Sequence, residues 1–155
     1  MSDPTPDEDR LTGMLAAFTP EVAAQGAECV VRLRARMPTA TVMVYDNYNA
    51  LAIGFMPNDR PSDAIVSIAV FPRWCTLCFL KDGPRLPDPH GLLKGGGVRV
   101  RHVRLPEPAY LDDPAIVALL DAALAMAVPP MPAGPPGRLL IRSVSARRRP
   151  RRPGG

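Results

Sequence analysis

The sequence contains few aromatic residues, histidines and cysteines, and these shortages exclude several classes of protein. Aromatic residues make up 5% of the 155 residues, and there are two histidines and three cysteines. His90 has only Asp88 nearby as a second candidate ligand, and two ligands fall short of the three or four that zinc takes. An odd number of cysteines without framework spacing is typical of reduced thiols. We therefore expect neither a zinc site nor a disulfide-stabilised scaffold.

Long apolar segments and a secretory signal are also missing. The best candidate for a membrane span, residues 115–128, is shorter than the roughly 18 apolar residues that a span needs, and it contains Asp121. Residues 1–9 are acidic and lack both the cationic and the apolar part of a signal peptide. We therefore expect a cytoplasmic protein that does not associate with membranes.

The positive charge is concentrated near the C-terminus. The net charge is +4, but five arginines lie within residues 147–152, and removing these five charges leaves −1 for the preceding chain. A duplex-binding protein needs a basic face on its folded domain, so we expect no specific nucleic-acid recognition. Residues 147–155 are expected to form a disordered, arginine-rich tail with weak, non-specific contacts to nucleic acid. Residues 1–10 are also expected to be disordered, which leaves residues 11–146 as one domain.

Local signals predict three helices. Thr19 and Pro20 provide an N-cap hydroxyl and a proline suited to the first helical position, and Pro38 ends the apolar pattern that follows. Asp113 and Pro114 repeat these start signals before a broad apolar face. A shorter helix is expected at residues 10–18.

From residue 41 the hydrophobic period changes to two, which predicts β-strands. Most connections are too short for a crossover helix, so neighbouring strands should pair antiparallel. The exception is residues 81–97, a loop whose length is typical of functional or disordered segments. The elements predict an α+β fold, a two-layer sandwich whose antiparallel sheet of five or six strands is packed by N-terminal and C-terminal helices. The expected strands are residues 41–45, 51–55, 64–71, 75–80, 98–105 and 138–145.

The glycine loop that precedes residue 101 is the main candidate site. Three consecutive glycines allow backbone N–H groups to form a concavity, and neighbouring cations add positive charge. A phosphate loop would place Gly-Lys-Ser/Thr after the loop and a helix behind it, so this pattern predicts a looser anion site. The alternative is a turn followed by the solvated face of a half-buried strand. The candidate ligand residues are Lys94, Gly95, Gly96, Gly97, Arg99 and Arg101, with Tyr45 and Asn47 from a polar segment that either completes the pocket or forms a turn of its own.

The segment Trp74-Cys75-Thr76-Leu77-Cys78 superficially matches a redox motif in which two cysteines open a helix. Gly83 and Pro84 follow too closely for a helix to form. In a strand, residues three apart point to opposite faces, so the two thiols should diverge. We expect packing cysteines, with Cys29 part of the apolar stripe of the preceding helix.

Four segments occur in an ordered set: Tyr-Asp-Asn-Tyr-Asn-Ala-Leu-Ala-Ile-Gly-Phe at residues 45–55, Ile-Val-Ser-Ile-Ala-Val-Phe-Pro at 65–72, Leu-Leu-Lys-Gly-Gly-Gly at 92–97 and Ile-Arg-Ser-Val-Ser-Ala at 141–146. Together they resemble the YdhG-like family, catalogued as domain of unknown function 1801. The resemblance covers roughly residues 11–146. One branch of that family is frataxin-like, which implies iron delivery as a function. Iron binding of that type uses acidic residues clustered along a first helix and the adjoining strand, and the helix that begins after Thr19 offers Glu21 and Glu28.

The residues do not combine into a catalytic set. No acid, base and nucleophile can be assembled from the motifs, and no Gly-x-Ser-x-Gly elbow occurs. We therefore expect a non-enzymatic cytoplasmic domain, without a resident cofactor, that binds a small anionic ligand or a partner protein. The alternative is a frataxin-like protein that binds and delivers iron.

Overall fold

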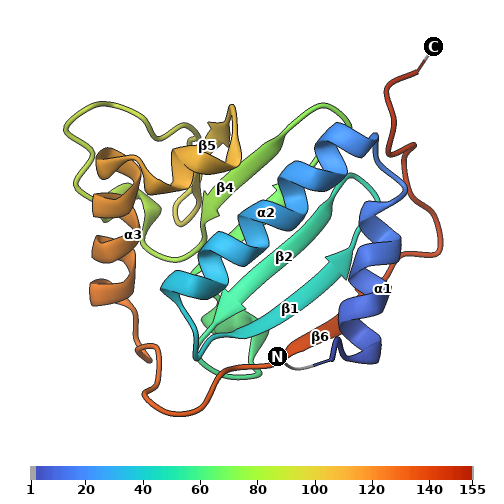
Figure 1. Cartoon of the computed structure of the whole chain (residues 1–155). Helices are drawn as coiled ribbons and strands as arrows, with labels where there is room; N and C mark the ends of the chain where they lie inside the picture. Colours follow the sequence, from blue (N-terminus) through green and yellow to red (C-terminus); the bar gives the residue numbers. More distant parts are fainter. Residues whose placement is uncertain (1–2, 155) are drawn as a thin grey trace.

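Six strands form one sheet in the order β5-β4-β3-β2-β1-β6 in the computed structural model, which describes residues 3–154 (Figure 1). Three α-helices and three short 3-10 helices complete the domain. The helices are α1 (Pro6–Leu15), α2 (Pro20–Arg36) and α3 (Pro114–Met126), and the strands are β1 (Thr41–Asp46), β2 (Leu51–Met56), β3 (Val66–Val70), β4 (Cys75–Phe79), β5 (Arg101–Leu105) and β6 (Leu139–Val144). The 3-10 helices are η1 (Pro61–Asp63), η2 (Gly83–Arg85) and η3 (Pro108–Asp112).

The helices begin where the local signals place them. The Val22 backbone N–H donates to Thr19 Oγ1 at 3.3 Å, and the Ala115 N–H donates to Asp113 Oδ1 at 3.0 Å, so both side chains satisfy free amides at a helix start. Proline occupies the first turn of each α-helix, where no N–H is needed.

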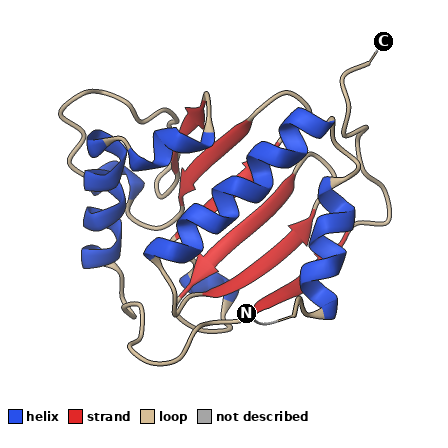
Figure 2. Ribbon diagram, in the orientation of Figure 1, coloured by secondary structure: helices blue, strands red, loops and turns tan. Residues whose placement is uncertain are grey.

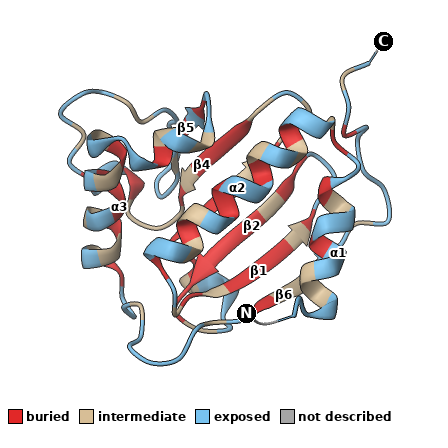
Figure 3. Cartoon of the chain, viewed as in Figure 1, coloured by how far each residue is buried: buried red, intermediate tan, exposed pale blue. Residues whose placement is uncertain are grey.

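All three α-helices contribute to one core against the same face of the sheet. Leu11 and Leu15 of α1, Leu33 of α2 and Leu119 of α3 are buried in one apolar cluster with alternate residues of the strands. Figure 2 shows α1 and α2 in front of the strands and α3 beside them, and Figure 3 shows the buried sides of the helices turned toward the sheet. We call this the helix face and its opposite the helix-free face. The predicted α+β sandwich is confirmed.

Strand pairing departs from the expectation at one edge. Strands β1 to β5 pair antiparallel in chain order, but β6 pairs parallel with β1. A parallel neighbour requires a long connection, and the whole chain between β1 and β6 provides it. The sheet is therefore mixed. The Gly137 N–H donates to Pro38 O at 2.9 Å where the chain enters β6, just before β1 begins.

Both ends of the chain are more ordered than predicted. Helix α1 begins at Pro6, inside the segment expected to be disordered, because Thr5 and Glu8 form a reciprocal capping box. Residues 147–154 pack against the domain rather than forming a free tail, for reasons given below. Residues 1, 2 and 155 of the two predicted disordered ends lie outside the described residues.

Candidate functional site

The predicted glycine-loop site is a hairpin tip at the sheet edge. Lys94 and His102 form an isolated antiparallel bridge, with backbone hydrogen bonds of 2.8 and 2.9 Å. Arg99 precedes β5 rather than alternating within it, so it does not share a strand face with Arg101. The Arg101 guanidinium turns back on its own loop, where Nη1 donates to the Val100 carbonyl at 2.8 Å. Of the predicted cations, Arg101 thus contacts the glycine segment itself, because its Nη1 also donates to the Gly97 carbonyl.

Tyr45 and Asn47 lie elsewhere in the fold. They lie at the end of β1 and in the turn after it, while the glycine loop precedes β5. Four strand spacings separate β1 from β5, which is about 19 Å. The structure does not bring these two residues together with the glycine loop. Because each of these strands pairs with the next one in the chain, β1 and β5 lie four positions apart in the sheet.

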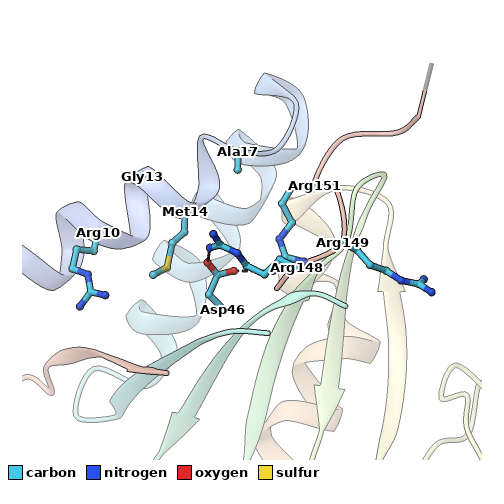
Figure 4. A pocket seen from close by; sticks show the side chains of 8 residues that line it. All are labelled: Arg10, Gly13, Met14, Ala17, Asp46, Arg148, Arg149 and Arg151. Atoms are coloured by element: carbon cyan, nitrogen blue, oxygen red, sulfur yellow. Dashed lines mark hydrogen bonds and ion pairs between the residues drawn. The ribbon is translucent and has the colours of Figure 1, made fainter. Parts of the chain in front are cut away.

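A different cleft brings together residues that the sequence analysis did not connect (Figure 4). It lies between α1, the end of β1 and the C-terminal segment, and has a volume of about 500 Å³. We call it the arginine cleft. Its lining residues are Arg10, Gly13, Met14, Ala17, Asp46, Arg148, Arg149 and Arg151.

Asp46 anchors the floor of the arginine cleft. Its side chain is 3% exposed, and Arg151 Nη2 donates to its Oδ1 at 2.8 Å. Arg148 Nη1 donates to the other carboxylate oxygen. A buried carboxylate requires such partners, because an unpaired charge is strongly disfavoured away from water.

Arg151 has unused hydrogen-bonding capacity. Its side chain is 7% exposed, and its guanidinium carbon lies 5.6 Å from the centre of the Phe18 ring, a distance typical of a cation–π contact. Its Nη1 atom is buried and has no hydrogen-bond partner in the described protein. Buried polar atoms are nearly always satisfied, so Nη1 requires an acceptor that the protein does not supply, either a water molecule or a ligand atom.

The C-terminal segment is held along its length. The Ser145 N–H donates to Asp46 O at 2.9 Å, and the Arg149 N–H donates to Tyr48 O at 2.8 Å. Arg152 donates to the carbonyls of Ala16 and Ala17 at the end of α1, where helix carbonyls lack internal partners. These contacts explain why residues 147–154 are ordered, against the expectation from composition.

The sequence held one signal for this site. Asp46 is the only carboxylate within the six described strands, and it ends an otherwise apolar strand. A lone buried carboxylate calls for a cationic partner. The composition of the C-terminal arginines predicts a solvated tail and therefore does not indicate this pairing. The positive charge of Arg10 does not by itself indicate that this residue lines the arginine cleft.

The cysteines lie as the strand alternation predicts. Cys75 is buried in the core on the helix face, whereas Cys78 pairs across the strands with Ser67 and His102 on the opposite face. Cys29 is buried on α2 and its thiol contacts that of Cys75.

No group of three potential metal ligands occurs within residues 3–154. Of the two carboxylates considered for iron, Glu21 is exposed and Glu28 accepts a 3.0 Å hydrogen bond from Arg32. Iron delivery therefore stays a prediction without a specific supporting contact.

None of the helices within residues 3–154 combines the length and the apolar character needed to cross a bilayer. The chain matches no family model, and neither a curated protein nor a solved structure shows detectable similarity to it. The resemblance to the YdhG-like family therefore stays a prediction.

Proposed function

We propose that the arginine cleft binds a small anion carrying phosphate or carboxylate groups. The observation that carries this proposal is the free, buried Nη1 donor of Arg151 beside a cavity lined by three further arginines. Guanidinium groups present planar, paired donors that match carboxylate and phosphate oxygens.

The charge of the arginine cleft favours an anion. The guanidinium of Arg149 lies over the Tyr48 ring and points away from the cleft (Figure 4), but the other three lining arginines outnumber the single carboxylate, Asp46, so the lining carries a net positive charge. Arg148 is 45% exposed and Arg10 55% exposed, so both retain donors that can turn toward a ligand. The field of several cations raises the local concentration of anions and speeds their capture.

The size of the arginine cleft suits a small molecule. A volume of about 500 Å³ lies within the usual range of ligand pockets. Gly13 of α1 and Ala17, which follows the end of that helix, contribute only small side chains to the wall of the cleft, and a Cβ added at Gly13 would meet nothing within 4 Å. The space above Gly13 is therefore free for a ligand.

The lining supports binding rather than catalysis. Its only carboxylate, Asp46, is already held by two arginines, and no serine, cysteine or histidine lines the cleft to serve as nucleophile or base. The proposed role is therefore that of a non-enzymatic anion-binding domain.

Isothermal titration calorimetry with inorganic phosphate and pyrophosphate tests this function. We expect saturable binding that is at least tenfold weaker in Arg148→Ala. Gly13→Leu should also abolish binding, because its side chain fills the cleft without removing a charge. Arg60→Ala, an exposed arginine outside the cleft, is the matched control.

Absence of saturable binding to either anion in the wild-type protein would contradict the proposal. Equal affinities in the wild type and Gly13→Leu would also contradict it, because the anion would then bind elsewhere.

A further inference from the structure

A second hollow lies on the helix-free face of the sheet, far from the arginine cleft in the strand order. It has a volume of about 370 Å³ and lies over β4 and β5. We call it the tryptophan groove. Its lining residues are Phe71, Trp74, Thr76, Cys78, His102 and Arg104.

Aromatic rings and a guanidinium form one wall of the tryptophan groove. The ring centres of Phe71 and Trp74 lie 5.8 Å apart, and the guanidinium carbon of Arg104 lies 4.4 Å from the centre of the Trp74 ring. Arg104 is exposed, and both aromatic rings are partly exposed. Aromatic rings and guanidinium planes are the surfaces on which unpaired nucleobases stack.

Strand register extends this groove across the sheet. Tyr45 of β1 pairs with Ala52, Ala52 with Ala69, Ala69 with Thr76, and Thr76 with Arg104 of β5. Small side chains thus form a floor between an aromatic ring at one end and a cation at the other. Ala52 and Ala69 remain partly exposed, whereas Thr76 is buried and Tyr45 packs against the apolar cluster of Met43, Met56 and Ala64.

The neighbouring row across the sheet carries small side chains on β2 to β4, and the methyl group of Met56 lies close to Gly54. Gly54, Ser67 and Cys78 occupy this row in register, and His102 ends it at β5. Four strand spacings give the whole path from Tyr45 to Arg104 a length of about 19 Å.

The charges of the strands differ between the two faces, with Arg101 sharing the helix-face parity of Val103 and Leu105. Asp46 is the only carboxylate in the six described strands, and it lines the arginine cleft on the helix face. On the helix-free face, Arg104 lies at one end of the path, and at the other end the exposed Arg142 of β6 lies between the Val44–Ile141 and Tyr45–Ser143 pairs, where the register shifts. The net charge of −1 before residue 147 conceals this separation, because the remaining acidic residues lie in helices and loops.

We propose that the helix-free face, through the tryptophan groove and its extension to Tyr45, binds single-stranded nucleic acid. Aromatic rings and Arg104 stack bases, and the cations at both ends contact phosphates. Double-stranded nucleic acid should not bind to this face, because its bases are already stacked on each other and cannot stack on the aromatic rings. An acidic peptide shares the charge but has no planar bases for the aromatic wall.

Trp74 is the single tryptophan of the chain, so its fluorescence reports on this groove alone. The experiment titrates the full-length protein with the octanucleotides dT8 and U8 in low salt. At roughly 3.4 Å per stacked nucleotide, eight nucleotides exceed the 19 Å path. We expect saturable quenching, because a stacked base contacts the indole or the guanidinium above it.

Three variants locate the site. Arg104→Ala should weaken binding about tenfold, the usual effect of losing one stacking partner. Ala69→Leu should also weaken it, because a larger side chain blocks the floor of the groove. Arg85→Ala, a highly exposed arginine outside the groove, should bind like the wild type.

The same titration separates this proposal from binding by the C-terminal arginines. Arg148→Ala, the C-terminal variant, should leave the quenching within twofold of the wild type, because Arg148 lines the arginine cleft and not the tryptophan groove. Binding of either octanucleotide supports the proposal, and the ratio of their dissociation constants shows which sugar is preferred. Loss of binding in the C-terminal variant but not in Arg104→Ala would overturn the proposal, as would absence of quenching. Equal affinity for an octaglutamate peptide would also overturn it.

Discussion

Asp46 and Arg151 lie 105 positions apart in the chain, yet Arg151 Nη2 donates a 2.8 Å hydrogen bond to Asp46 Oδ1 in a buried ion pair. This contact ties the C-terminal segment to the end of β1. It also forms the floor of the arginine cleft, so the order of the segment and the shape of the candidate site depend on the same two side chains.

Asp46→Asn should destabilise the domain and release the C-terminal segment. The substitution leaves the Arg151 charge buried without a counter-charge, and breaking a buried ion pair in this way costs about 3 kcal/mol. Urea unfolding should show the loss in free energy. Limited trypsin digestion should cut after Arg148 faster than in the wild type. Asp121→Asn, on the exposed side of α3, serves as control, and unchanged protection of the segment in Asp46→Asn would contradict its packing against the domain.

Gly83→Ala should be strongly destabilising, whereas Gly96→Ala in the same long connection should be nearly neutral. A Cβ at Gly83 would lie 2.7 Å from Arg101 N and 2.8 Å from Arg99 O, and backbone atoms cannot move aside cheaply. At Gly96 the Cβ would meet nothing within 4 Å. We expect a loss of about 2 kcal/mol for Gly83→Ala by urea unfolding. Equal stabilities of the two variants would show that the connection does not pack against β5 as described.

Stability should fall in acid partly through Glu8. The hydrogen bond from the Thr5 backbone N–H, with that from Arg34 at 2.9 Å, holds the pKa of the Glu8 carboxyl below its usual value of 4.5. Because the folded pKa is lower than the unfolded one, the carboxylate contributes stability above about pH 4.5. This contribution disappears as the pH falls through the folded pKa.

Glu8→Gln should therefore reduce the loss of stability between pH 5 and pH 3, measured as the urea midpoint at each pH over roughly this acid range. The exposed Glu21→Gln is the control. A steeper acid dependence in Glu8→Gln than in the wild type would contradict this assignment.

Two of the three thiols should be unreactive in the native protein. Cys29 and Cys75 are each 1% exposed. The hydrogen bond with Cys75, together with burial, raises the pKa of the Cys29 thiol, and the same contact lowers the pKa of Cys75. Burial also raises the pKa of Cys78, which is partly exposed.

Ellman's reagent should therefore label Cys78 slowly and leave the other two thiols unmodified until urea is added, since both reactivity and access require an exposed thiolate. Cys78→Ala should remove the native reaction. Rapid labelling of all three thiols in the native protein would contradict the described core.

Much of the secondary structure follows from local patterns. Thr19 and Asp113 cap helices within their own turns, and the period-two pattern of residues 41–80 requires only that one face of each strand be buried. The divergence of Cys75 and Cys78 follows from the same alternation. These features depend on neighbours a few positions away, which is why they could be predicted.

The sequence by itself determined the α+β class, the helix starts and the alternating strand faces, because capping and periodicity act over a few residues. Only the tertiary structure decided three other features: the parallel pairing of β6 with β1, the packing of the C-terminal arginines, and the arginine cleft. Each depends on contacts between segments about a hundred residues apart, such as Asp46 with Arg151. Whether a charged segment forms buried ion pairs or stays solvated depends on which buried partner the fold places beside it. A local sequence pattern does not predict that contact.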